Sequence, residues 1–184
     1  MPSVPEGGDT ADLRVGPEID ERLLAVLPLV GRWAGHGTGV RPADGSEFSF
    51  AQRVSFTHDG RPFLHYDSRT WLLDSAGAVE RPAFRESGFL RIGAGADAGP
   101  DSDELELVLA TAAGIVEVFA GVAGDRRWEL ATTAVGFTPT AKQIAGERRL
   151  YALVDEALVY VQELALEPGR FAPHLNAQLP RQRR

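Results

Sequence analysis

Hydrophobic and polar side chains alternate along most of the chain after residue 29. Phe48, Phe50, Val54 and Phe56 lie at alternate positions and are separated mainly by polar or small residues. A period of two is the signature of a β-strand with one buried face. Similar β-type runs cover residues 105–109, 115–119, 128–133, 149–153 and 158–166.

Short turn signals separate these runs, among them Asp59-Gly60 and Gly124-Asp125. Strands therefore recur about every 10 to 12 residues, and the pattern predicts an all-β fold of about ten antiparallel strands. The arrangement is either an up-and-down β-barrel or a sandwich, and closure into a barrel hides the strand edges. A barrel of about ten strands is wider than its own side chains can fill, which favours a bound ligand.

The N-terminal part follows a different pattern. Residues 1–18 are rich in Pro, Gly and acidic residues without periodicity, which predicts a disordered tail before a barrel domain over residues 19–184. Ile19, Leu23, Val26 and Leu27 have helical spacing, so we expect one short amphipathic helix that stops near Pro28 and caps the barrel.

Composition excludes several classes of protein. The chain has no cysteine and a net charge of -7, which removes disulfides and thiolate chemistry and speaks against binding to nucleic acid. Its basic C-terminal run, residues 181–184, is interpreted as a solvated terminus. No apolar run is long enough to cross a membrane and no secretory signal is recognised, so we expect a cytoplasmic protein.

Imidazole is the main candidate for a strong metal ligand in a chain with one methionine and no cysteine. The sequence predicts that His36 packs or faces solvent, that His58 is a turn residue and that His65 has a structural place, with cavity lining as its alternative. His174 lies near the C-terminus, where the residues alone favour a surface histidine.

A glycine motif opens the first predicted strand. Gly31, Trp33, Gly35 and Gly37 form G-x-W-x-G-x-G, in which glycines allow a close backbone approach and the tryptophan closes the barrel end. Four further segments follow in order: residues 85–91 (RESGFLR), 114–118 (GIVEV), 139–142 (PTAK) and 174–175 (HL). Together they resemble the nitrobindin family of haem-binding β-barrels over roughly residues 24–184.

The resemblance implies a ten-stranded barrel that holds one haem b near its open end. His174 matches the family's axial iron ligand, and Lys142 matches a position that touches the haem, where it either pairs with a propionate or is solvated. Phe84 and Phe89 are expected near the mouth. The implied activity is isomerisation of peroxynitrite to nitrate at ferric haem, with nitric oxide as a further ligand and no general base required.

The chain departs from the family pattern at two positions. Ala43 stands where many members have a threonine beside the haem, and Phe84 stands where some have a histidine. Both changes make the pocket less polar. The alternative function is a non-catalytic carrier or sensor barrel for an apolar ligand such as a fatty acid or haem, and the sequence is silent on oligomeric state.

Overall fold

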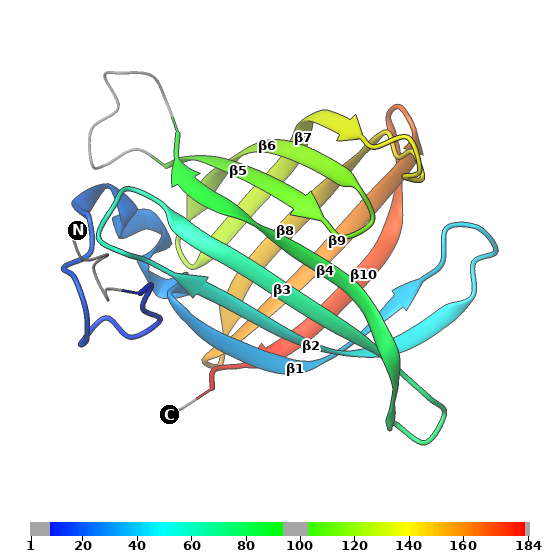
Figure 1. Ribbon diagram of the computed structural model, residues 1–184, viewed down its shortest axis with the longest axis horizontal. Helices are drawn as coiled ribbons and strands as arrows, with labels where there is room; N and C mark the ends of the chain where they lie inside the picture. The colour runs from blue at the N-terminus through cyan, green and yellow to red at the C-terminus, as the bar shows by residue number, and fades with distance from the viewer. Residues whose placement is uncertain (1–7, 94–102, 183–184) are drawn as a thin grey trace, which may run out of the picture.

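Ten antiparallel strands close into one barrel in a computed structural model that describes residues 8–93 and 103–182 (Figure 1). Each strand pairs with its neighbours in the chain, and β1 closes the barrel by pairing with β10. The predicted up-and-down barrel is therefore confirmed. The elements are η1 (Glu21–Leu29), β1 (Gly31–Val40), β2 (Glu47–Thr57), β3 (Leu64–Leu73), β4 (Val79–Ile92), β5 (Glu104–Thr111), β6 (Ile115–Gly124), β7 (Arg127–Phe137), β8 (Gly146–Val154), β9 (Ala157–Glu167) and β10 (Arg170–Pro180).

Alternation along the strands divides a packed interior from the outer surface. In β3, Leu64, Tyr66 and Leu72 point inward and are buried, while Arg69 lies on the outer face. The interior near η1 is filled by large side chains from most strands, so the apolar core lies in that half of the barrel. Its largest members are Trp33, Trp128, Phe119 and Leu64, whereas the buried Phe50 lies nearer the open end, beside Phe48.

The glycine motif allows β1 to approach its neighbours closely. A Cβ atom at Gly37 would collide with the carbonyl oxygen of Asn176 on β10 and with the ring of Phe50 on β2. Trp33 is 1% exposed, and its indole Nε1 donates a hydrogen bond to the Leu29 carbonyl at 3.0 Å. The motif therefore closes the barrel end beside η1.

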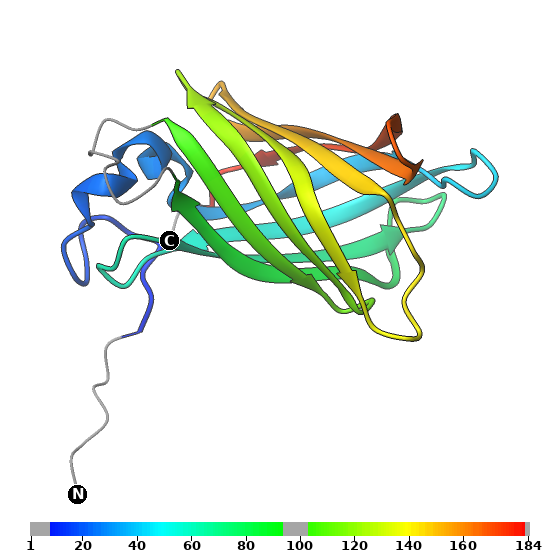
Figure 2. The same cartoon turned by 90° about the horizontal axis from the view of Figure 1, so that it is seen from above.

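The capping helix η1 covers one end of the barrel, opposite the β1–β2 and β7–β8 loops (Figure 2). Leu23, Val26 and Leu29 are buried against the barrel, and Trp128 donates from its indole to the Ala25 carbonyl at 2.8 Å. The predicted short helix is thus present; it is a 3-10 helix and ends at Leu29, one residue after Pro28. No helix in the described part of the chain is long and apolar enough to cross a membrane.

Two terminal segments pack on this closed end. Thr10 forms an antiparallel bridge with His58, so the structure differs from the predicted tail beyond its first seven residues, which lie outside the described part. At the other terminus, Arg181 lies 4.0 Å over the Trp33 ring and donates to the Pro28 carbonyl at 2.8 Å. Arg181 is thus exposed, as the sequence predicts, while its guanidinium also caps the end of η1.

Candidate ligand site at the open end of the barrel

His174 is presented by a β-bulge in the last strand. On β9, Glu163 pairs with Pro173 and the adjacent Gln162 pairs with Leu175, which leaves His174 as the extra residue of β10. A bulge re-aims a side chain and tolerates a proline, which has no N–H for the ladder. The chain thereby directs a half-buried imidazole toward the barrel mouth instead of the outer surface.

A backbone hydrogen bond selects the tautomer of the neutral imidazole. His174 Nδ1 lies 3.0 Å from the carbonyl oxygen of Val40 at the end of β1. A carbonyl only accepts, so Nδ1 carries the proton and donates it. The neutral ring then has its lone pair on Nε2, which is the arrangement that hydrogen-bonding partners impose on a metal-binding histidine.

The imidazole borders a cavity of about 530 Å³ at the end opposite η1. This volume lies within the range of about 300–1,000 Å³ found for small-molecule and cofactor sites. The Phe84 ring meets His174 edge-on at 6.3 Å between centroids, and Phe48 lies 6.3 Å from Phe84. Apolar side chains complete the walls, namely Leu72, Ile144, Leu164 and Leu166.

Three basic residues line the same cavity in a protein whose net charge is negative. Arg41 lies in the β1–β2 loop, Arg81 is on β4 and Lys142 is in the β7–β8 loop. Arg41 stacks 5.0 Å over the Phe48 ring and donates to the Ser46 hydroxyl at 3.2 Å. The cavity thus combines one imidazole, apolar walls and three cations, which suits a flat apolar ligand with anionic groups at its edge.

Both residues that depart from the family pattern line this cavity. Their side chains, a methyl group and a phenyl ring, carry no hydrogen-bonding atom. Phe84 is near the mouth as expected. Phe89 is not, because it lies on the outer face of β4, is 47% exposed and packs edge-on against Phe63.

The other three histidines do not reach the cavity. His36 is exposed on the outer face of β1, in agreement with the prediction. His65 is also on the outside, where its Nε2 lies 3.0 Å from the Ser87 hydroxyl, so the alternative of cavity lining is wrong. His58 forms a β-bridge with Thr10 rather than being a turn residue; it is 1% exposed, and burial lowers its pKa.

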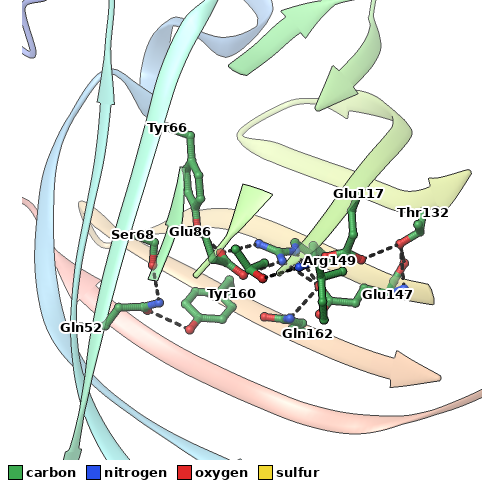
Figure 3. A network of polar contacts seen from close by, with 12 residues as sticks. Gln52, Tyr66, Ser68, Glu86, Glu117, Thr132, Glu147, Arg149, Tyr160 and Gln162 are labelled. Carbon is green, nitrogen blue, oxygen red and sulfur yellow. Dashed lines mark hydrogen bonds and ion pairs between the residues drawn. The ribbon is translucent and has the colours of Figure 1, made fainter. Parts of the chain in front are cut away.

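Below the cavity, a cluster of charged side chains occupies the middle of the barrel (Figure 3). Arg149 on β8 has a side chain only 2% exposed and donates two parallel hydrogen bonds of 2.9 Å to Glu86 on β4. The same guanidinium contacts Glu147 at 2.7 Å, and Gln162 donates to that carboxylate at 2.7 Å. We call Arg149, Glu86, Glu147 and Glu117 the Arg149 cluster.

The charges of this cluster perturb one another. Burial opposes the charge on Arg149, but Glu86 and Glu147 outweigh it and raise the pKa of the guanidinium. Burial likewise opposes the charge on Glu86, and the bidentate pair with Arg149 nevertheless lowers its pKa. These two groups are therefore ionised at neutral pH.

Glu117 on β6 behaves differently. Its side chain is buried and lies 3.4 Å from the Thr132 hydroxyl, without a direct bond to Arg149 in the described structure. Burial, reinforced by the charge on Glu147, raises the pKa of Glu117 to about 7. This carboxyl group therefore exchanges a proton near neutral pH.

Sequence reasoning missed this cluster. Glu117 shares its face of the strand with Ile115 and Phe119 in a β-type run, and this position is the one signal that an acidic side chain faces the interior. The partners come from strands far apart in the chain, with 63 residues between Arg149 and Glu86. By contrast, Glu104 and Glu106, which the sequence predicts to be solvated, lie on the outer side of β5.

Comparisons with known proteins agree with the fold and the motifs. A family model described as the THAP4-like, heme-binding beta-barrel domain matches residues 22–181. The "Ferric nitrobindin-like protein" of Saccharopolyspora erythraea is 44% identical over 180 residues, which cover 97% of this chain and 82% of that protein. The "Peroxynitrite isomerase 2" of Rhodococcus jostii is 42% identical over 184 residues, which cover 98% of this chain and 86% of that protein.

A solved structure is similar as well. The crystal structure of Rv2717c from M. tuberculosis matches with a TM-score of 0.76 and 31% sequence identity, over 90% of this chain and 100% of that one. The likeness inferred from the ordered motifs is thus confirmed. The chain belongs to the THAP4-like, haem-binding β-barrel family.

Proposed function

We propose that the protein binds one haem b at the open end of the barrel and, with its iron ferric, isomerises peroxynitrite to nitrate and binds nitric oxide. His174 is the proposed axial ligand and the one protein group with a direct part in catalysis. Support comes from family membership, from relatives named peroxynitrite isomerase at about 40% identity, and from the geometry around His174.

The observation that carries the proposal is the bond between His174 and Val40. Because Nδ1 donates to the carbonyl, Nε2 has a free lone pair in a cavity with apolar walls. The bond to the backbone also fixes the plane of the imidazole ring, so exchange of a small ligand at the iron would not require this ring to rotate. These are the properties expected of an axial ligand.

The basic residues of the rim suit the two propionates of a haem. Lys142 is the only lysine of the chain and lines the cavity together with Arg41 and Arg81. We propose that Lys142 pairs with one propionate, the role that the sequence left open. Arginines add planar donors for the other carboxylate.

When bound, a ferric haem supplies a Lewis-acidic iron with one exchangeable position, and isomerisation leaves the proton count of the substrate anion unchanged. The residues of the chain contribute positioning and exclusion. His174 would hold the iron, while Phe84 and Phe48 would shield this imidazole from water. The apolar character of Ala43 and Phe84 leaves no donor there that competes for the substrate.

A fatty-acid carrier is the weaker alternative. A lipid tail needs an apolar passage into the barrel, whereas the Arg149 cluster fills the interior below the mouth. A carboxylate that entered the barrel head first would meet no free cation at this cluster, because Arg149 already contacts both Glu86 and Glu147. Insertion would therefore require desolvation of an anion beside two others.

Stopped-flow mixing with peroxynitrite tests the proposed activity. The hemin-loaded protein should accelerate peroxynitrite decay beyond an equal concentration of free hemin, with nitrate as the product, and the protein without hemin should not. If hemin binds with a sharp Soret band but decay is no faster than with free hemin, the protein is a carrier or sensor and the catalytic proposal is wrong.

A further inference from the structure

The Arg149 cluster carries an excess of acidic groups in a buried place. One guanidinium faces three carboxyl groups, of which Glu86 and Glu147 bond to it directly. With Glu117 protonated, the cluster has one positive and two negative charges. Such an excess is costly in a low-dielectric interior and calls for an explanation beyond packing.

The cluster begins directly beneath the site proposed for haem. Glu86 is two residues after Phe84 on β4, and the Phe84 ring meets His174 edge-on. Glu86, Glu147 and Arg149 are tied together by bonds of 2.7 to 3.0 Å. A change of charge near His174 therefore alters the electrostatic energy of the cluster, because little water lies between them to screen it.

We propose that the Arg149 cluster is a redox-linked proton site, which keeps bound haem in the ferric state by its negative charge and takes up one proton at Glu117 when the iron is reduced. This inference rests on the haem binding proposed above. In the coupled step, a one-electron reductant such as dithionite delivers an electron to the iron, and a proton from solvent forms an O–H bond on the Glu117 carboxylate.

Glu117 is the member of the cluster best suited to this exchange. Glu86 and Glu147 bond directly to Arg149, whereas Glu117 has the Thr132 hydroxyl on β7 as its hydrogen-bond partner. Its raised pKa, about 7, gives it both protonation states near neutral pH.

The remaining groups around Glu117 do not compete for the proton. On the β5 side it faces Leu109 across the ladder. Tyr66, Tyr151 and Tyr160 border the cluster from β3, β8 and β9, and burial raises the pKa of each phenol, so all three stay neutral. Toward the mouth lie His174, which is the proposed ligand in the loaded protein, and the basic residues Arg41, Arg81 and Lys142.

Potentiometry of the hemin-loaded protein tests the inference with Glu117→Gln and a matched control, Glu129→Gln. Glu129 lies on the outer face of β7, where its exposed carboxylate pairs with Arg127 at 2.9 Å. The reduction potential of the wild type should fall as the pH rises through about 7. The slope should approach 59 mV per pH unit, because a tenfold change in proton concentration corresponds to 59 mV for one electron.

Glu117→Gln should flatten this slope and raise the potential above that of the wild type only at alkaline pH, where the carboxyl group is ionised. Glu129→Gln should follow the wild type. An unchanged slope in Glu117→Gln overturns the inference. If the wild type fails to form a Soret band with hemin, the proposed haem binding fails first, and the inference falls with it.

A second measurement uses the wild type alone, so it does not depend on folding of a variant. The infrared difference spectrum between reduced and oxidised forms at pH 7.5 should gain the C=O stretch of a protonated carboxylic acid on reduction. Loss of carboxylate bands should accompany it. A difference spectrum without a carboxylic-acid band would overturn proton uptake at Glu117 even if haem binding is normal.

Discussion

His174 and Val40 are joined by a hydrogen bond of 3.0 Å between the imidazole Nδ1 and a backbone carbonyl at the end of β1. The donor lies on β10 and the acceptor on β1, the two strands whose pairing closes the barrel. Barrel closure therefore sets the orientation of the proposed ligand. Because the acceptor is main chain, substitution of the Val40 side chain leaves the bond in place.

Lys142→Ala should weaken hemin binding up to about fivefold. Exposed ion pairs contribute about 0.2–1 kcal/mol, and Lys142 is on the solvent-exposed rim. The dissociation constant, measured by Soret titration at low salt, checks this value. Hemin dimethyl ester has no propionate charge, so it should bind the variant and the wild type equally well. A loss of the same size with the ester would exclude propionate pairing.

Gly37→Ala should destabilise the protein by about 1–3 kcal/mol, because the new methyl group must displace the backbone of β10 or the Phe50 ring. Gly136→Ala is the matched control, since its Cβ has only the Val116 carbonyl nearby, at 3.9 Å. Urea denaturation gives both free energies of unfolding. Equal effects of the two substitutions would contradict the role assigned to the glycine motif.

Stability of the hemin-free protein should depend on pH through Glu117. Its folded pKa, about 7, exceeds the ordinary value of 4.5, so the folded state binds more protons than the unfolded state between these values. The contribution of Glu117 is complete below pH 4.5 and is lost as the pH rises through 7.

Glu117→Gln removes this loss. The difference in free energy of unfolding between the variant and the wild type should therefore shift in favour of the variant, by on the order of 3 kcal/mol, from pH 4.5 to above pH 7. Each pH unit between the unfolded and folded pKa values contributes about 1.36 kcal/mol. Comparison with the wild type at each pH cancels other titrating groups such as His58. A difference between the two proteins that is constant from pH 4.5 to 8 would be incompatible with a perturbed Glu117.

Arg149→Met should destabilise the protein by about 3–5 kcal/mol, because it leaves the Glu86 and Glu147 carboxylates buried without their cation. Arg149→Met combined with Glu86→Gln should recover part of this loss, since one uncompensated charge is removed. Thermal and urea unfolding of the four proteins in the cycle measure the coupling. Strict additivity of the two substitutions would show that the bidentate pair is not an energetic unit.

The architecture could be predicted because the strands and turns of the barrel follow from short sequence patterns. The period of two in residues such as 48–56 and the turns such as Asp59-Gly60 need no long-range information, and the strands indeed pair in chain order. Helix η1 was also predicted, but its 3-10 form and its passage through Pro28 depend on contacts with the barrel.

The site was predicted only in part. The ordered motifs pointed to His174 and Lys142, and the structure brings both to one cavity. The bulge that aims His174 depends on the pairing of β9 with β10, and the sequence does not encode it as a local pattern. Arg149 and Glu86 meet across the barrel from β8 and β4, so their contact emerges only after closure.

Titration of the purified protein with hemin, comparing wild type, His174→Ala and His36→Ala, tests the central claim most directly. His36→Ala is the matched control, because His36 is exposed on the outer face of the barrel. The wild type and His36→Ala should both form a sharp Soret band at one hemin per chain, and His174→Ala should give only the broad spectrum of unligated hemin. Identical sharp bands in all three proteins would contradict axial ligation by His174.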